Sequence, residues 1–316
     1  MPLHIETPLI ISEILSDLVN KDIRLKLDAL QPSGSFKIRG VGFACEYFAL
    51  RGAKSFLSSS GGNAGMAVAY AGKKLGIPVK VIVPETTSAR SISLLKKDNA
   101  EVIIHGSSWL EANELAQSLL NDETAFIHPF DDELLWSGHS TIIDEVRVTD
   151  FKPDLIILSV GGAGLLAGVI KGLLNNKWED TPIMAVETFG AASLNKSLKK
   201  GETVELDKIS SLATSLGAKK VSEGAFKLAC AHNVKSVLTS DLDTLLACEN
   251  FLSDHKILVE PACGAALSPI YNQLDELEAF SKILVIVCGG STMSVSYTHL
   301  RAHETKANLV CRLLLE

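Results

Sequence analysis

Short apolar runs alternate with helical patterns along most of this chain, and that alternation constrains its fold more than any other feature. Strands are expected at residues 8–11, 23–28, 55–58, 79–84, 101–104, 125–130, 154–160, 183–187 and 283–288. Helices are expected at 37–51, 66–75, 88–97, 108–120, 136–149, 165–174, 221–232, 242–254 and 262–273. The repeated order of strand, loop, helix and strand is that of βαβ units, whose strands run parallel. The sequence therefore predicts an α/β architecture with at least two groups of parallel strands.

Composition and charge narrow the class of protein. Of the 316 residues, 47% are hydrophobic and 21% are charged, as in an ordinary globular protein. The net charge of −7 argues against nucleic acid or an anionic membrane as a partner. No apolar run reaches membrane-spanning length, and residues 1–6 lack the basic and apolar segments of a signal peptide.

The cysteines indicate a reducing compartment. Six of them stand at positions 45, 230, 248, 263, 288 and 311, with no Cys-x-x-Cys pair. This spacing is typical of reduced and mostly buried thiols. We therefore expect a cytoplasmic protein.

A lysine in a serine- and glycine-rich turn is the first candidate for chemistry. Lys37 ends the stretch 32–37 (PSGSFK), and apolar residues at helical spacing follow it. A partly buried amine at a helix N-terminus has a lowered pKa, which a lysine needs to form a Schiff base with a carbonyl. On this stretch alone, a surface lysine at the start of a helix is the more common explanation.

Three glycine-rich loops follow predicted strands, at 60–65 (SGGNAG), 161–164 (GGAG) and 288–291 (CGGS). Ligands bind at this edge of open α/β sheets. The second loop presents backbone N–H groups at a helix N-terminus, where phosphate groups bind. Its spacing is not that of a dinucleotide loop, so a single phosphate fits better. A tight turn that requires glycine for its geometry alone would explain the same residues.

The other two loops add side-chain groups. Ser60 and Asn63 suit a carboxylate or a phenolate oxygen, and either residue is also suited to capping the helix that follows. These two roles do not exclude each other. Cys288 offers a weakly polar group at a strand end, although taken alone it is typical of a small buried hydrophobe.

A Schiff-base lysine, a phosphate loop and a carboxylate loop are what pyridoxal phosphate and an amino acid require together. The sequence resembles the serine/threonine dehydratase (ammonia-lyase) branch of the fold-type II pyridoxal-phosphate enzymes, from residue 4 to about residue 295. The stretches 32–37, 60–65, 160–165 and 287–291 resemble that family's motifs for the cofactor lysine, the substrate carboxylate, the phosphate and the pyridine nitrogen. The variants GGNAG and CGGS resemble most the L-serine dehydratases of the liver type and their microbial relatives.

The resemblance implies roles for individual residues. Lys37 would hold the cofactor as a Schiff base and, once released, would take the Cα proton of the substrate. Phe36 would lie against the ring, Asn63 would bond to its phenolic oxygen, and Cys288 would face the pyridine nitrogen. The phosphate would be held mainly by the backbone of Gly161, Gly162, Ala163, Gly164 and Leu165, with Ala163 where a further glycine is usual. The substrate carboxylate would be held by Ser60, Gly61, Gly62 and Asn63.

The resemblance also implies a monovalent cation, typically potassium, near the phosphate. Its ligands would come from Gly161, Glu187, Ala191, Leu216 and Ala218. Most of these would bind through backbone carbonyls, which leave almost no mark in a sequence. For Glu187 alone, an ordinary carboxylate at a strand end is an equal explanation.

The implied architecture has two open, twisted and mainly parallel sheets flanked by helices, with the cofactor in a cleft between a small and a large domain. The large domain would comprise residues 1–34 and 135–295, and the small domain residues 35–134. A homodimer is expected. Residues 296–316 match nothing in the family and are interpreted as a non-native tail, with a divergent terminal helix as the alternative.

The implied reaction is β-elimination from L-serine, and from L-threonine, which yields pyruvate or 2-oxobutanoate and ammonium. The Cys288 thiol favours this outcome, because a thiol cannot keep the pyridine nitrogen protonated as a carboxylate would. A weaker electron sink disfavours a long-lived carbanion, so loss of the hydroxyl prevails. Serine racemase, threonine synthase and cysteine synthase activities are the alternatives within the class. A catalytically idle homologue that binds an amino acid is the alternative from another class.

Overall fold

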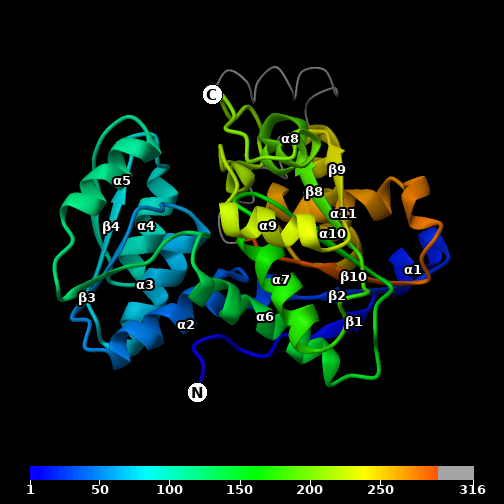
Figure 1. Cartoon of the computed structure of the whole chain (residues 1–316), viewed down its shortest axis with the longest axis horizontal. Helices are drawn as coiled ribbons and strands as arrows, with labels where there is room; N and C mark the ends of the chain where they lie inside the picture. The colour runs from blue at the N-terminus through cyan, green and yellow to red at the C-terminus, as the bar shows by residue number, and fades with distance from the viewer. Residues whose placement is uncertain (291–316) are drawn as a thin grey trace.

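The computed structural model describes residues 1–290 and arranges their strands in two separate sheets. Figure 1 shows the two sheets, each with its own helices, as two parts that lie side by side. The part with four strands is built from a continuous piece of chain, residues 55–126, whereas the part with six strands takes strands from both ends of the described chain.

The four-stranded sheet consists of β3 (Ser55–Ser58), β4 (Val79–Val83), β5 (Glu101–Ile104) and β6 (Thr124–Phe126), in the order β5-β4-β3-β6. All of its neighbouring strands pair in parallel. Its helices are α3 (Asn63–Leu75), α4 (Ala89–Lys97) and α5 (Trp109–Ser118). Phe56 belongs to the main core together with α3, whereas Leu57 forms a separate apolar cluster with Ala112 of α5. Because side chains alternate across a strand, α3 and α5 cover opposite faces of this sheet.

The six-stranded sheet has the order β1-β2-β10-β7-β8-β9. Its strands are β1 (Leu9–Ile11), β2 (Asp22–Lys26), β7 (Leu155–Ser159), β8 (Ile183–Thr188), β9 (Val234–Thr239) and β10 (Lys282–Ile286). The edge strand β1 is antiparallel to β2, and the other pairs are parallel. Strand β7 is buried along its whole length, which explains its nearly continuous apolar sequence.

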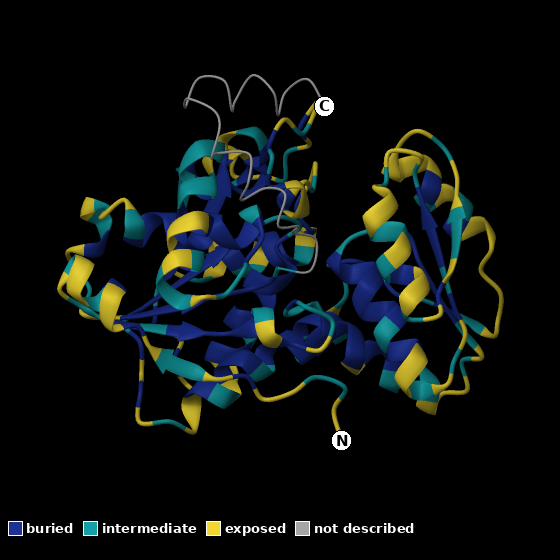
Figure 2. Ribbon diagram, turned by 180° about the vertical axis from the view of Figure 1, so that it is seen from behind, coloured by how far each residue is buried: buried dark blue, intermediate teal, exposed yellow. Residues whose placement is uncertain are grey.

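Two helices, α2 (Lys37–Leu50) and α6 (Glu133–Arg147), join the two parts of the molecule. The helices not yet given are α1 (Glu13–Val19), α7 (Gly164–Asn175), α8 (Ser193–Lys200), α9 (Glu223–Ala231), α10 (Asp241–His255) and α11 (Pro261–Tyr271). Short 3₁₀ turns lie at Asp28–Leu30, Phe189–Ala191, Thr214–Leu216 and Asp275–Leu277. Helix α2 packs against α3 of one part and α6 of the other, and α6 packs in turn against α7. Figure 2 shows buried residues concentrated in both sheets and at the helices between them.

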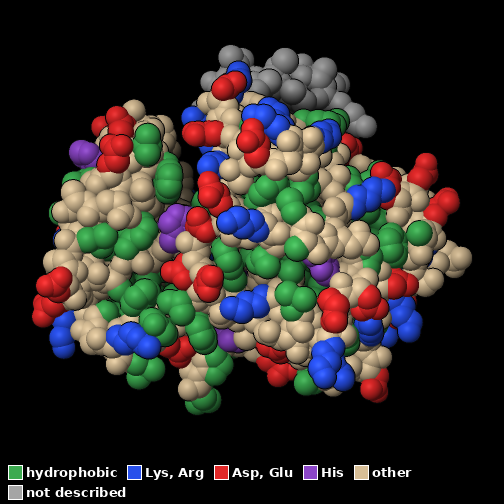
Figure 3. Space-filling model, viewed as in Figure 1, with side chains coloured by type: hydrophobic (Ala, Val, Ile, Leu, Met, Phe, Trp, Pro, Cys, Tyr) green, Lys and Arg blue, Asp and Glu red, His purple; other side chains and the backbone are tan. Residues whose placement is uncertain are grey.

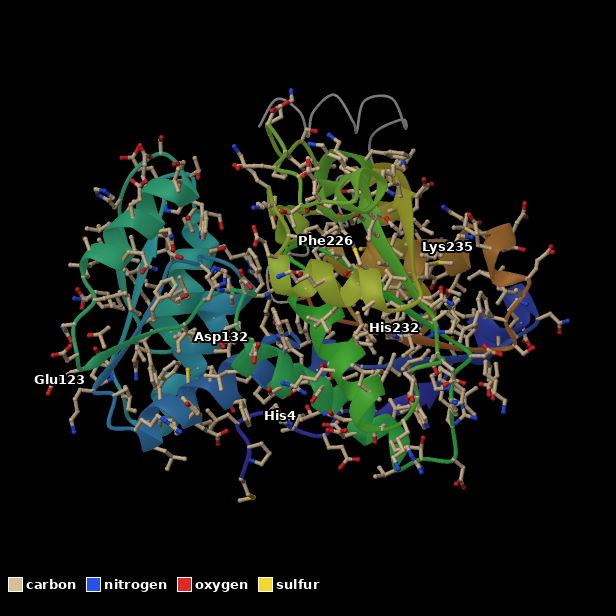
Figure 4. All side chains as sticks on the ribbon, viewed as in Figure 1. His4, Glu123, Asp132, Phe226, His232 and Lys235 are labelled. Carbon is tan, nitrogen blue, oxygen red and sulfur yellow. The ribbon has the colours of Figure 1, made fainter. Side chains whose placement is uncertain are left out.

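A buried ionic cluster fixes this junction. Arg39 of α2 is fully buried, and its Nε donates to Asp28 Oδ2 at 2.6 Å. Its terminal nitrogens donate to the two carboxylate oxygens of Glu145 in α6, at 2.5 and 2.8 Å. Lys26 also donates to Glu145, and His4, labelled in Figure 4, lies 3.9 Å from the same carboxylate. Since buried charges are stable only when paired, this cluster holds α2 and α6 in one arrangement.

The sequence predicted most of these elements but missed or displaced some. The strand expected at 125–130 ends at Phe126, because the imidazole Nδ1 of His128 accepts the backbone N–H groups of Phe130 and Asp131 and turns the chain. Helices α1 and α8 and strand β9 were not predicted. Helices α1 and α8 are short, and β9 is an edge strand with little continuous apolar sequence.

Two expectations about how the chain is divided stay predictions. The proposed domain boundaries near residues 34 and 134 are one of them. The interpretation of residues 296–316 as a tail is the other, and it falls outside the described residues. Within residues 1–290, no helix has the length and apolar character needed to cross a membrane.

Candidate active site

The turn that carries Lys37 is hydrogen-bonded to the loop that follows β10 of the six-stranded sheet. The backbone N–H of Phe36 donates to the carbonyl oxygen of Cys288 at 2.8 Å, and that of Gly290 donates to Gly34 at 3.0 Å. The half-buried Phe36 and the buried Cys288 therefore lie together at the C-terminal end of β10. The lysine turn and the third glycine loop, which are far apart in sequence, form one surface.

Lys37 is the first residue of α2, as the sequence predicts. Its Nζ donates to the carbonyl oxygen of Pro129 at 2.6 Å. Lys37 is half-buried as a residue, and desolvation of its amine by burial lowers the pKa of Lys37 to about 8. Negative charge on Cys288 or Glu260 would oppose the shift. The lowered pKa expected from the sequence is confirmed, with burial as its main cause.

The loop expected to bind phosphate follows β7 and leads directly into α7. Ala163 is the N-cap of α7, with a φ of 67° in the left-handed region, where residues other than glycine are uncommon. Since no side chain caps this helix, the N–H groups of its first turn, from Gly164 and Leu165 onward, are available to an anion. Gly162 has no room for a side chain, because a Cβ there would lie 2.2 Å from Cγ of Phe130.

The loop expected to bind a carboxylate follows β3 and leads into α3. The predicted capping of this helix by Ser60 or Asn63 is wrong: the helix begins at Asn63, its N-cap is Gly62, and no side chain caps it. The Ser60 hydroxyl instead accepts the backbone N–H of Gly62 at 3.3 Å. Gly61 lies against Thr87, whose Cγ2 would be 2.8 Å from a Cβ at residue 61. The uncapped start of α3 is a second place where backbone donors can meet an anion.

The side chain of Asn63 bonds to a residue that the sequence analysis missed. Its Nδ2 donates to Oε1 of Glu260 at 2.6 Å. Glu260 is 2% exposed and is the N-cap of α11, in the part built on six strands. The one signal in the sequence was an acidic residue directly before Pro261, a pair typical of a helix start.

Cys288 lies two residues after the end of β10 and is 4% exposed. Its Sγ lies 3.6 Å from the hydroxyl oxygen of Ser159 at the end of β7. Hydrogen bonding with Cys263, together with burial, holds the pKa of Cys288 well above its ordinary value. The side chain is therefore a neutral thiol at the edge of the site.

The segment 128–131 was also missed, because the sequence predicted a strand there. It follows β6, supplies the carbonyl that accepts the Lys37 hydrogen bond, and places a phenyl ring over the phosphate loop. Asp131 accepts a hydrogen bond from the hydroxyl of Ser222, the N-cap of α9. In Figure 4 the next residue, Asp132, lies between the two parts of the molecule.

These contacts show which predicted residues come together. The Asn63–Glu260 and Lys37–Pro129 hydrogen bonds and the packing of Phe130 on the phosphate loop join the ends of β3, β6, β7 and β10. The loops converge where the two sheets meet, and Figure 3 shows the surface hollowed between the two parts. Ligand sites of α/β proteins lie at such an edge.

The residues expected to hold a cation give a mixed result. Gly161 and Leu216 are adjacent, since a Cβ on Gly161 would lie 3.0 Å from Cα of Leu216. The Leu216 carbonyl accepts the backbone N–H of Ala218 at 2.8 Å, and Ala191 is fully buried in the 3₁₀ turn after β8. Among residues 1–290, no group of three or more His, Cys, Asp or Glu side chains could hold a metal ion. A cation here would depend on backbone carbonyls.

Glu187 has another partner in the described structure. Its carboxylate oxygens accept the backbone N–H groups of Leu194 and Asn195, at 2.8 and 2.7 Å, at the start of α8. Burial raises the pKa of Glu187 to about 7, against the effect of these two bonds. The ordinary structural explanation for this carboxylate therefore has direct support.

Comparisons with known proteins agree with this arrangement. The sequence model of the family described as "Pyridoxal-phosphate dependent enzyme" matches residues 1–289. A human protein named L-serine dehydratase/L-threonine deaminase is 45% identical, over 99% of this chain and 98% of the relative. An L-serine dehydratase of Dictyostelium discoideum is 43% identical, over 93% of this chain and 90% of the relative. The crystal structure of a fungal L-serine ammonia-lyase from Rhizomucor miehei superposes with a TM-score of 0.90 at 36% identity, covering 96% of this chain and all of that one.

The fold thus defines an α/β enzyme of the fold-type II class, with two mainly parallel sheets flanked by helices. The chain belongs to the family of pyridoxal-phosphate dependent enzymes.

The site residues fit that cofactor. A lysine of lowered pKa stands beside an aromatic side chain, and an uncapped helix N-terminus stands ready for a phosphate. The hydroxyls of Ser33 and Ser35, in the lysine turn, are buried without a hydrogen-bond partner among the described residues. Buried polar groups without hydrogen-bond partners are rare in native proteins, and they are expected where a polar ligand binds.

Proposed function

We propose that this protein catalyses the β-elimination of L-serine, and of L-threonine, with pyridoxal phosphate as its cofactor. The products are pyruvate or 2-oxobutanoate, together with ammonium, which makes the protein an L-serine/L-threonine ammonia-lyase. One observation carries the proposal: the Lys37 amine, with a pKa of about 8, lies where the glycine loops after β3, β7 and β10 converge. The names of the human, Dictyostelium and fungal relatives support the choice of substrate.

The chain holds the cofactor through both sheets. Pyridoxal phosphate supplies a carbonyl carbon for the substrate amine and an electron sink for the Cα electrons. The backbone of Gly161–Leu165 binds its phosphate, aided by the start of α7. Phe36 would pack against the ring, Asn63 would donate to the phenolic oxygen, and Cys288 would stand at the pyridine nitrogen.

Lys37 is both the anchor of the cofactor and the base. With a pKa of about 8, a useful fraction of its amine is neutral near pH 7, and a neutral amine can take the Cα proton of the substrate. The backbone of Ser60–Asn63, at the start of α3, holds the substrate carboxylate. With its carboxylate held here and its amino group held by the cofactor, the substrate would present its Cα–H bond to the Lys37 amine.

Cys288 directs the reaction toward elimination. The pKa of its thiol is raised, so the group stays neutral and gives the pyridine nitrogen no negative partner that would keep it protonated. With pyridoxal phosphate bound, this weaker electron sink would favour loss of the β-hydroxyl over reprotonation at Cα. Racemase and synthase activities, the alternatives within the class, need a longer-lived carbanion or a second substrate.

We further infer a potassium ion beside the phosphate loop. Gly161, Leu216 and Ala218 supply carbonyls, with Ala191 and Glu187 completing the set of ligands. The closeness of Gly161 to Leu216 supports this arrangement. The measurement is the melting temperature in potassium, sodium and lithium chloride at one ionic strength. A specific rise in potassium is expected, and equal values would contradict the site.

The quaternary state and compartment complete the proposal. Phe43 and Leu50, two turns apart on α2, are 43% and 87% exposed, so one face of this helix offers apolar surface to a second copy. We therefore infer a homodimer, which light scattering of the wild-type protein and of Phe43→Glu can check. The free thiols of Cys45, Cys248 and Cys263, all buried, favour a reducing compartment, the cytoplasm.

A substrate panel tests the function. Purified protein loaded with pyridoxal phosphate is expected to show the visible absorbance of a lysine-bound cofactor. It should then release one keto acid and one ammonium for each molecule of L-serine or L-threonine consumed. D-Serine as the main product would favour the racemase alternative. A cofactor-loaded protein that binds L-serine but turns over none of it would favour the idle homologue.

A further inference from the structure

We propose that Glu260 is a positioning residue that orients the side-chain amide of Asn63 toward the phenolic oxygen of pyridoxal phosphate. The inference deepens the proposed function and rests on it, because it takes Asn63 to be a cofactor contact. It assigns a role to a buried carboxylate that none of the glycine motifs includes.

The first step is the chemistry of the hydrogen bond between the two side chains. A carboxylate only accepts hydrogen bonds, whereas an amide has a donor end and an acceptor end. The 2.6 Å contact therefore fixes which end of the Asn63 amide faces Glu260: it is the nitrogen, Nδ2. This nitrogen carries two hydrogens, so one can serve Glu260 and the other a second acceptor. A phenolate oxygen is such an acceptor, and an amide turned the other way would repel it.

The second step is that both partners are held rigidly. Asn63 is 7% exposed and is the first residue of α3, so its backbone belongs to a helix. Glu260 is 2% exposed, and its backbone N–H donates to Gly289 at 3.1 Å, in the loop beside the lysine turn. Its carbonyl accepts the N–H groups of Cys263 and Gly264 at 2.8 and 3.0 Å. A buried carboxylate on a backbone anchored in this way is a fixed reference for the amide.

The third step is that the bond joins the two parts of the molecule. Asn63 follows β3 of the four-stranded sheet, whereas Glu260 precedes α11, which packs on β7, β8 and β10 of the other sheet. The contact therefore presents the amide correctly only when the two parts stand at the distance found here. A purely structural tie would hold the parts together equally well with donor and acceptor exchanged, and that difference provides the test.

The test exchanges donor and acceptor between the two positions. Asn63→Asp places a carboxylate against Glu260 and removes the N–H groups that face the cofactor. The double variant Asn63→Asp with Glu260→Gln restores a hydrogen bond, now donated by the introduced glutamine amide to the introduced aspartate carboxylate. It leaves no amide N–H at position 63 for the phenolic oxygen. Glu260→Gln alone keeps an acceptor but no longer selects one amide orientation. For each protein, the dissociation constant of pyridoxal phosphate is measured by fluorescence titration and the melting temperature is measured without cofactor.

Three results are expected if Glu260 orients the amide. Glu260→Gln melts close to wild type but binds the cofactor several-fold more weakly. Asn63→Asp loses both melting temperature and affinity. The double variant recovers the melting temperature of wild type while its affinity stays at least about tenfold weaker. Recovery of affinity in the double variant, or cofactor binding by Glu260→Gln within twofold of wild type, would overturn the proposal.

A matched control comes from the other end of α11. Tyr271, the last residue of α11, donates its hydroxyl to the Asp254 carboxylate of α10 at 2.9 Å. Asp254→Asn therefore changes a carboxylate that contacts α11 at the end away from the site. Its cofactor affinity is expected to equal that of wild type. Failure of the proposed function would look different, because wild-type protein would then fail to bind pyridoxal phosphate or to release keto acid, whatever the variants did.

Discussion

The amine nitrogen of Lys37 lies 2.6 Å from the carbonyl oxygen of Pro129, so the start of α2 and the exit from β6 hold each other through one hydrogen bond. A carbonyl oxygen can accept a hydrogen bond from a lysine amine whether that amine is neutral or protonated. The bond therefore places the amine without deciding its charge. Burial decides the charge, by lowering the pKa to about 8.

The first prediction concerns pH. The ordinary pKa of a lysine is 10.5, and here it is about 8, so the neutral, nucleophilic amine accumulates as pH rises through about 8. The rate at which cofactor-free protein captures pyridoxal phosphate is expected to rise over this range and to level off above it. Stopped-flow absorbance at constant ionic strength measures the rate. A rise centred near the ordinary lysine value instead would show that the amine is not perturbed.

The second prediction is that Lys37→Ala abolishes both the visible absorbance of bound cofactor and keto-acid release from L-serine. The same amine anchors the cofactor and moves the proton, so both are lost together. Lys171→Ala is the control, since this lysine of α7 donates to the Ser137 hydroxyl and should leave both signals intact. Wild-type turnover by Lys37→Ala would overturn the assignment.

The third prediction is that Gly162→Ala weakens cofactor binding by about tenfold or more. A Cβ at this position would meet the Phe130 ring at 2.2 Å, and relief of such overpacking typically costs about 1–3 kcal/mol. Adding Phe130→Leu should recover part of the loss, because the smaller side chain gives way. Cofactor titration and thermal melting separate the two effects. Unchanged affinity with impaired folding would mean that the loop is only structural.

The fourth prediction is that Cys288→Asp changes the choice of reaction. A carboxylate beside the pyridine nitrogen would keep it protonated and strengthen the electron sink. Elimination should therefore slow relative to racemisation and transamination, as product analysis from L-serine would detect. Cys288→Ser is the control, because serine adds no charge. Cofactor occupancy is measured first, since a buried aspartate can also weaken binding. Full occupancy with an unchanged product ratio would contradict a role for Cys288.

The fifth prediction concerns the buried ionic cluster at the junction. Arg39→Met leaves the carboxylates of Asp28 and Glu145 without their shared partner, and breaking a buried pair in this way costs about 3–5 kcal/mol. Urea denaturation should show a loss of that size. Lys152→Met, which removes an exposed pair with Asp180, should show no measurable change. Equal stability of the two variants would mean that the cluster contributes nothing net.

The sequence predicted those parts of the fold and site that depend on local patterns. The apolar runs of β7 and β10 and the glycine loops after them follow from neighbouring residues alone, and so does the position of Lys37 at a helix start. Burial of that lysine, by contrast, was only a conditional expectation, because the Pro129 carbonyl that receives it lies 92 residues away.

The parts that could not be predicted depend on contacts between distant segments. Glu260 matters because α11 brings it to Asn63, a pairing across 197 residues with no local pattern. The prediction that Ser60 or Asn63 caps α3 was wrong for a different reason: Gly62 is the N-cap and has no side chain, whereas propensity favours serine or asparagine there. Strand β9 forms on the edge of a sheet that β8 already provides, so its own sequence carries little signal.

The strand order of the six-stranded sheet has a consequence for how the protein is made. Strand β2 pairs with β10, so that Asp22 lies opposite Lys282, and the sheet is incomplete until a ribosome has synthesised nearly all of the described chain. The four-stranded sheet, contiguous in residues 55–126, has no such requirement. Because the Phe36 N–H is held by Cys288, the lysine turn is set only after β10 emerges. We therefore expect that a nascent chain cannot complete the lysine turn before the end of synthesis, and that a product truncated before β10 binds no cofactor.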